Sequence, residues 1–90
     1  MSEPDRQLVS LLPLLENPRS EAGLTDGEAA ALIAFGATAW SDHWAGAALD
    51  WVDQGVWSDE VLQALRSTAQ DKTYSQATRH RAWRYIKRSG

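Results

Sequence analysis

Hydrophobic positions along the chain recur at the spacing of α-helices. Near the start, leucines repeat at i, i+3, i+4 and i+7, which places them on one face of a helix. They are Leu8, Leu11, Leu12 and Leu15. Pro4 and Asp5 are suited to begin this helix, whereas Pro13 removes one of its backbone hydrogen bonds. We therefore predict a helix over about residues 5–15 that ends near Leu12 or is kinked there, followed by an irregular turn.

Four further helices are predicted, each with a residue suited to cap its N-terminus. Thr25 or Asp26 precedes an alanine-rich segment, and Glu28 is placed to complete a capping box. The other caps are Ser41, Ser58 and Ser75, and Gly55 is placed to end the helix that Ser41 begins. No segment shows the alternation of a β-strand. The sequence therefore predicts an all-α fold, an orthogonal or antiparallel bundle of five helices, with αα-hairpins over about 25–55 and 58–88 and an N-terminal capping helix.

The helix expected after Ser41 has small and aromatic hydrophobic side chains over more than half of its circumference. They are Trp40, Trp44, Ala45, Ala47, Ala48, Leu49, Trp51 and Val52. So wide an apolar arc predicts a helix that is packed on two sides, at the centre of the bundle. The rest of the circumference carries Asp42, His43, Asp50 and Asp53. We interpret this acidic face as solvated, as a docking surface for a basic partner, or as a surface that meets the chain's own basic helix.

The tryptophans are expected to differ in burial. Trp40, Trp44 and Trp51 share one face with alanines between them, which is how large and small side chains interdigitate in a core. Trp57 lies in a loop before the Ser58 cap. It is therefore expected to be partly exposed, packing on Leu62 as a hydrophobic staple.

The last helix divides into two arcs. Its apolar arc is formed by Ala82, Trp83, Tyr85 and Ile86, and its basic arc by His80, Arg81, Arg84, Lys87 and Arg88. Arg79 lies within the apolar arc, so we expect an ion pair with Asp71 in the preceding turn. The basic arc has two interpretations. It binds phosphate groups, or it is solvated, complements the helix dipole and pairs with the acidic helix.

The two expected hairpins are similar at a spacing of about 33 residues. Asp26 shifts onto Asp59, and with one extra loop residue Trp51 shifts onto Tyr85. The matched positions are caps and core positions. This is the pattern of two hairpins that use the same internal packing.

The second unit resembles a HEAT-type helical repeat. Its first helix has an "L..AL" pattern, Asp71 follows in the turn, and Arg79, Ala82 and Ile86 recur in the second helix. The first unit departs from this pattern, with Ala45 in the position of Arg79. The resemblance implies an αα-hairpin scaffold that binds protein partners, in some cases nucleic acid, and seldom catalyses a reaction.

Composition narrows the functional classes. The 90 residues include no cysteine, so disulfides and thiolate metal sites are excluded and a cytoplasmic setting is the default. The acidic start is unlike a secretory signal, and no apolar run is long enough to cross a membrane. His43 and His80 have no metal-binding spacing, and neither a glycine-rich phosphate loop nor a G-x-S-x-G motif occurs. We therefore expect no metal, no cofactor and no enzymatic activity, although His43 with Asp50 could in principle transfer a proton.

Charge is strongly polarised along the chain. The formal net charge is −3, yet residues 1–65 carry eleven acids and two bases, and residues 66–90 carry seven bases and one acid. We predict a non-catalytic protein-interaction module with an acidic and a basic face, whose partner is another protein or a second copy of the chain. The alternative is a small nucleic-acid-binding protein that uses its basic C-terminal helix.

Overall fold

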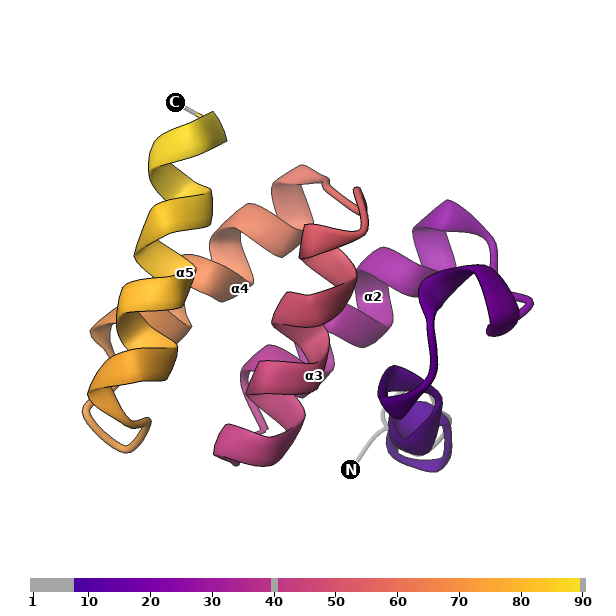
Figure 1. The fold of residues 1–90 in the computed structure, drawn as a ribbon, viewed down its shortest axis with the longest axis horizontal. Helices are drawn as coiled ribbons and strands as arrows, with labels where there is room; N and C mark the ends of the chain where they lie inside the picture. The colour runs from indigo at the N-terminus through magenta and orange to yellow at the C-terminus, as the bar shows by residue number, and fades with distance from the viewer. Residues whose placement is uncertain (1–7, 40, 90) are drawn as a thin grey trace.

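The computed structural model describes residues 8–39 and 41–89. Residues 8–11 are α-helical and lead into two short 3₁₀ helices, η1 (Leu12–Glu16) and η2 (Arg19–Glu21). Four longer helices follow: α2 (Asp26–Ala37), α3 (Asp42–Asp53), α4 (Asp59–Gln70) and α5 (Gln76–Ser89) (Figure 1). Within this part of the chain no strand occurs. The predicted all-α fold of five helices is confirmed, while the expected helix start at residue 5 and the expected burial of Trp40 lie outside the described residues.

The first helix changes type where Pro13 was expected to interrupt it. The α-helix continues to Leu11, and Pro13 occupies the start of η1. Proline suits this position because it has no N–H to donate to the preceding helical turn. Leu12 and Leu15 of η1 are buried in the core. The leucine face therefore remains on one side of the segment although the helix tightens.

The predicted caps begin the four longer helices. Thr25 and Glu28 form a reciprocal capping box, with hydrogen bonds of 2.9 and 3.2 Å. The hydroxyl oxygens of Ser41, Ser58 and Ser75 accept backbone N–H groups three residues ahead, over 3.1 to 3.4 Å. These bonds satisfy donors that the first helical turn leaves without a partner.

The helices form two antiparallel hairpins, α2 with α3 and α4 with α5. In addition, α2 packs on α4 and α3 contacts α5, so the hairpins lie side by side in two layers. The η1 segment covers α2 and α3 on the side away from α5 (Figure 1). Gly36 of α2 permits this close approach, because a Cβ atom there would lie 2.7 Å from Cδ1 of Leu15. No helix in residues 8–39 or 41–89 is long and apolar enough to span a membrane.

Trp51 lies at the centre of the core, where it is completely buried. Its indole N–H donates a 2.8 Å hydrogen bond to the carbonyl of Asn17, which joins α3 to the N-terminal segment. Trp44 is partly buried, and Trp57 exposes 39% of its surface, as its loop position predicted. The buried hydroxyl of Thr68 lies 2.7 Å from the carbonyl of Ala37 and therefore ties α4 to the end of α2.

Two details of the last hairpin differ from prediction. Trp83 was expected in the core but exposes 41% of its surface, because residues 8–39 and 41–74 cover α5 on the side where Ala82 and Tyr85 are buried. The expected ion pair of Arg79 with Asp71 is also wrong. Asp71 instead accepts the backbone N–H of Thr73 over 2.9 Å, a bond within its own turn. That bond lowers the pKa of Asp71.

Candidate interaction surface on the last helix

The side chains on this face of α3 are exposed, but all four interact with other segments of the chain: Asp42, His43, Asp50 and Asp53. Asp42 accepts the backbone N–H of Ser75 over 3.0 Å. This bond lowers the pKa of Asp42 and links the N-termini of α3 and α5. The Nε2 atom of His43 lies 2.7 Å from a carboxylate oxygen of Glu16. Thus Asp42 and His43 hold neighbouring segments in place.

Arg81 and Asp50 form the third of these contacts. The Arg81 guanidinium donates to the Asp50 carboxylate over 2.6 Å and to the Gly46 carbonyl over 3.3 Å. Partial burial would lower the pKa of Arg81, but its interactions with Asp50 and Tyr85 together raise it. The basic helix therefore meets the acidic helix at this point, and Arg81 holds α5 against α3.

The remaining basic residues of α5 face outward together with Trp83. His80, Trp83, Arg84 and Lys87 follow the spacing i, i+3, i+4 and i+7, and they line an open hollow of about 650 Å³. All four side chains are exposed. We call these four residues, together with Arg88, the α5 surface. Its permanent cations, Arg84, Lys87 and Arg88, form no hydrogen bond or ion pair with the described part of the chain.

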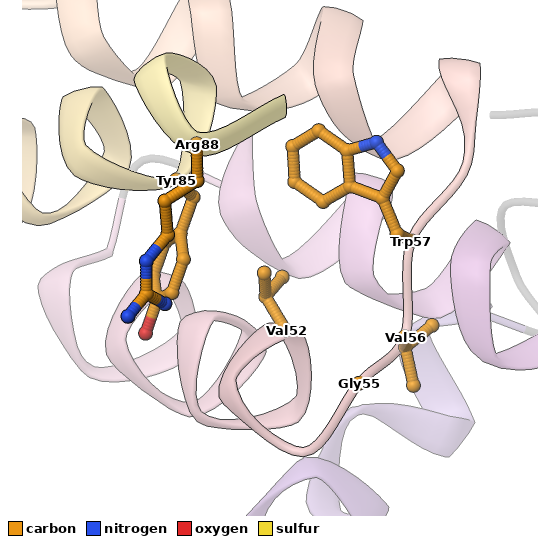
Figure 2. Close-up of a pocket in the computed structure, with 6 residues that line it drawn as sticks. All are labelled: Val52, Gly55, Val56, Trp57, Tyr85 and Arg88. Carbon is orange, nitrogen blue, oxygen red and sulfur yellow. The ribbon is translucent and has the colours of Figure 1, made fainter. Parts of the chain in front are cut away.

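Two smaller hollows continue from the α5 surface toward α3. Arg84 and Arg88 line a hollow of about 200 Å³ together with Asp53, Arg81 and Tyr85. Arg88 also lines a groove of about 330 Å³ at the end of α3 (Figure 2). The residues of this groove are Val52, Gly55, Val56, Trp57, Tyr85 and Arg88. Since Arg84 is shared by the first two hollows and Arg88 by the last two, the three hollows adjoin one another between Trp83 and Trp57.

Tyr85 lines both of the smaller hollows. It is 8% exposed, and the guanidinium groups of Arg81 and Arg88 lie 6.0 and 5.9 Å from its ring centroid. Burial, with Asp53 nearby, raises the pKa of the Tyr85 hydroxyl, although Arg81 acts in the opposite direction. The phenol is therefore neutral at physiological pH. Its ring supports the arginines through cation–π contact.

Some features of this surface were not predicted from the sequence. The exposure of Trp83 could have been found, since it shares its helical face with His80 and Lys87 at intervals of three and four residues. No short stretch of sequence predicts the groove, because its walls come from parts of the chain about 30 residues apart.

The chemistry of the surface is that of binding. Guanidinium and ammonium groups bind carboxylates and phosphates, and exposed indole rings bind apolar groups or stack on other rings. No cluster of three or more His, Cys, Asp or Glu side chains in residues 8–39 and 41–89 could hold a metal ion. No protein-family model, no curated protein and no solved structure matches the chain.

Proposed function

We propose that this protein is a non-catalytic protein-binding module that uses the α5 surface to bind an acidic partner. The observation that carries the proposal is the exposure of Trp83 beside Arg84 and Lys87. Tryptophan and arginine are the residues that most often dominate the binding energy of protein interfaces. Cations beside such an anchor accelerate encounter with an acidic protein and determine its orientation.

The arrangement of the helices supports a repeat-type scaffold for this module. Helices α2 and α4 begin 33 residues apart, and α3 and α5 begin 34 residues apart. Equivalent helices are neighbours, as expected where αα-hairpins stack. We therefore propose a HEAT-like pair of hairpins whose final helix presents its outer face to a partner. Because Arg79 and Asp71 are not paired, the likeness to a HEAT-type repeat lies in the arrangement of the helices and not in their internal polar contacts.

Nucleic acid is the second candidate ligand, and the position of Trp83 favours it as well. An exposed indole can stack on a base while Arg84 and Lys87 bind the flanking phosphates. Two observations weigh against it. Arg81 is engaged with Asp50, which leaves few cations for a polyanion. In addition, residues 1–65 carry a net charge of −9, which repels a long polyanion more than a short acidic segment.

A binding assay with charge-matched ligands tests the proposal. Polyglutamate and single-stranded oligothymidylate of equal charge would be titrated at low and at physiological salt. The variant is Arg84→Glu with Lys87→Glu. The control is Arg66→Glu with Lys72→Glu, which makes the same charge change at exposed positions outside the α5 surface.

We expect polyglutamate to bind more tightly than oligothymidylate, with an affinity that falls at higher salt. The α5 variant should lose at least about tenfold in affinity and the control much less, because only the former removes direct contacts. If oligothymidylate binds more tightly than polyglutamate, the proposal is wrong and the protein binds nucleic acid. If the two variants lose affinity equally, binding depends only on net charge, and this would contradict the proposal. Size-exclusion chromatography with light scattering, at low and high salt, tests whether a second copy is the acidic partner.

A further inference from the structure

The groove at the end of α3 has two walls from different parts of the chain. Trp57, in the α3–α4 connection, forms one wall, and Tyr85 and Arg88 of α5 form the other. Figure 2 shows the Trp57 ring across the groove from the Tyr85–Arg88 pair, with Val52 between them. A volume of about 330 Å³ is at the lower end of the range for small-molecule sites. The groove is thus suited to one bulky side chain.

The backbone that carries Trp57 is shaped by Gly55. This glycine has a φ of 103°, a conformation that residues with a side chain rarely adopt. It lies two residues after the end of α3 and turns the chain toward α4, which positions Trp57 over the groove. Trp57 remains 39% exposed. An indole so exposed, facing a largely buried tyrosine ring, leaves apolar surface that a ligand can cover.

The charge beside the groove is positive. Arg88 stacks on Tyr85, and its guanidinium is not paired with any carboxylate in the described part of the chain. Arg84 lines the adjoining hollow, where Asp53 supplies a carboxylate close to the Tyr85 hydroxyl. The groove therefore offers an apolar cleft with Arg88 at its edge and Arg84 in the adjoining hollow. A complementary ligand has an apolar side chain with acidic groups next to it.

We infer that the groove receives one bulky apolar side chain of an acidic protein segment, while Arg88 binds a neighbouring carboxylate of the same segment. The inference rests on the proposed function, because the segment reaches the groove by continuing from the α5 surface. It adds specificity to that function. Cations alone attract any acidic protein, whereas an apolar cleft between Trp57 and Tyr85 selects a segment with a large hydrophobic residue.

The experiment uses two short synthetic peptides of aspartate and glutamate. One has a single central phenylalanine and the other has alanine at that position. Each is titrated against the full chain, against Trp57→Ala and against Trp83→Ala. The last is the matched control, because Trp83 is equally exposed but belongs to the outer face of α5. Circular dichroism verifies that each variant is folded.

The full chain should bind the phenylalanine peptide about tenfold more tightly than the alanine peptide, because the ring is removed from water. Trp57→Ala should abolish this preference and leave the affinity for the alanine peptide unchanged. Trp83→Ala should retain the preference. If the wild type binds both peptides equally and in a salt-sensitive manner, the groove inference is wrong and the proposed function stands. If the preference is lost in Trp83→Ala instead, the anchor site is on the outer face. If neither peptide binds, both proposals fail.

Discussion

Trp51 connects helix α3 to the N-terminal segment of the chain. It is completely buried, and its indole N–H donates to the Asn17 carbonyl while Arg19 lies 5.9 Å from its ring centroid. One side chain thus joins α3 to the segment that covers it. Its burial followed from the wide apolar arc of α3, whereas its hydrogen bond to Asn17 links positions 34 residues apart and had no local signal.

Replacing Trp51 tests this role. Trp51→Phe removes the hydrogen bond and leaves part of the indole volume empty, so we expect a loss of about 2 kcal/mol in the free energy of unfolding. Urea denaturation followed by circular dichroism measures it. Trp57→Phe is the control and should change stability by less than about 0.5 kcal/mol, because Trp57 is partly exposed. Equal effects of the two substitutions would contradict the central position of Trp51.

Asp42 is predicted to make stability depend on acidic pH. The Ser75 N–H lowers its pKa in the folded state below the ordinary 3.8, so its contribution is present above 3.8 and is lost as the pH falls through the lowered value. Asp42→Asn keeps an oxygen that can accept the same bond but has no charge to titrate. Its melting temperature should therefore fall less than that of the wild type between neutral pH and about pH 2.

The matched control for this prediction is Asp59→Asn. Asp59 is the first residue of α4 as Asp42 is of α3, and it is exposed. The melting temperature of Asp59→Asn should therefore fall in acid by nearly as much as that of the wild type. An acid profile of Asp42→Asn that overlays the wild type would show that the bond to Ser75 does not contribute to stability.

The positions of the helices could be predicted because the residues that begin them lie close in sequence to the groups they bind. The capping box of α2 and the serine caps of the later helices lie within three residues of the groups they bind. The interruption of the first helix follows from Pro13, although its 3₁₀ geometry was not predicted. The pattern of hydrophobic and polar positions could not show which side of α5 remains exposed. An aromatic residue at the edge of an apolar arc is buried only if another element covers it, and within the described part of the chain no element covers Trp83 completely.

Thr68 provides a test of how one helix supports the end of another. It is the one buried polar side chain in the described part of the chain, and its hydroxyl lies 2.7 Å from the carbonyl of Ala37 in the last turn of α2. Thr68→Val preserves shape but removes the donor, so we expect a loss of about 1–2 kcal/mol in unfolding free energy. Thr68→Ser retains the hydroxyl and should retain most of this contribution. If Thr68→Val is as stable as the wild type, or if only Thr68→Ser is destabilised, the hydrogen bond does not contribute to stability.

At the level of the whole molecule, the two hairpins are joined by polar contacts as well as by the core. Asp42 bonds to Ser75, and Asp50 pairs with Arg81, so both contacts connect α3 to α5. The acidic helix α3 and the basic helix α5, which lie in different parts of the sequence, meet at these two contacts. The acidic face was predicted to be solvated, to dock a basic partner or to meet the chain's own basic helix, and that helix occupies part of it.

A double-mutant cycle of Asp50→Asn and Arg81→Met measures this coupling. Because the Arg81 side chain is 26% exposed and Asp50 is 61% exposed, solvent screens the pair. We expect a coupling free energy of about 0.5–1 kcal/mol, smaller at high salt. A coupling of zero at low salt would show that the Asp50–Arg81 pair does not help to hold the hairpins together.

The binding function of the molecule is tested most directly by mapping where an acidic ligand contacts it. The measurement is an NMR titration of the ¹⁵N-labelled chain with the phenylalanine-containing acidic peptide. We predict the largest shifts at the backbone amides of residues 80–88 and at the indole N–H signals of Trp83 and Trp57, with the indole of Trp51 unmoved. Shifts centred on α2 or the N-terminal segment, or no shifts at all, would contradict binding at the α5 surface.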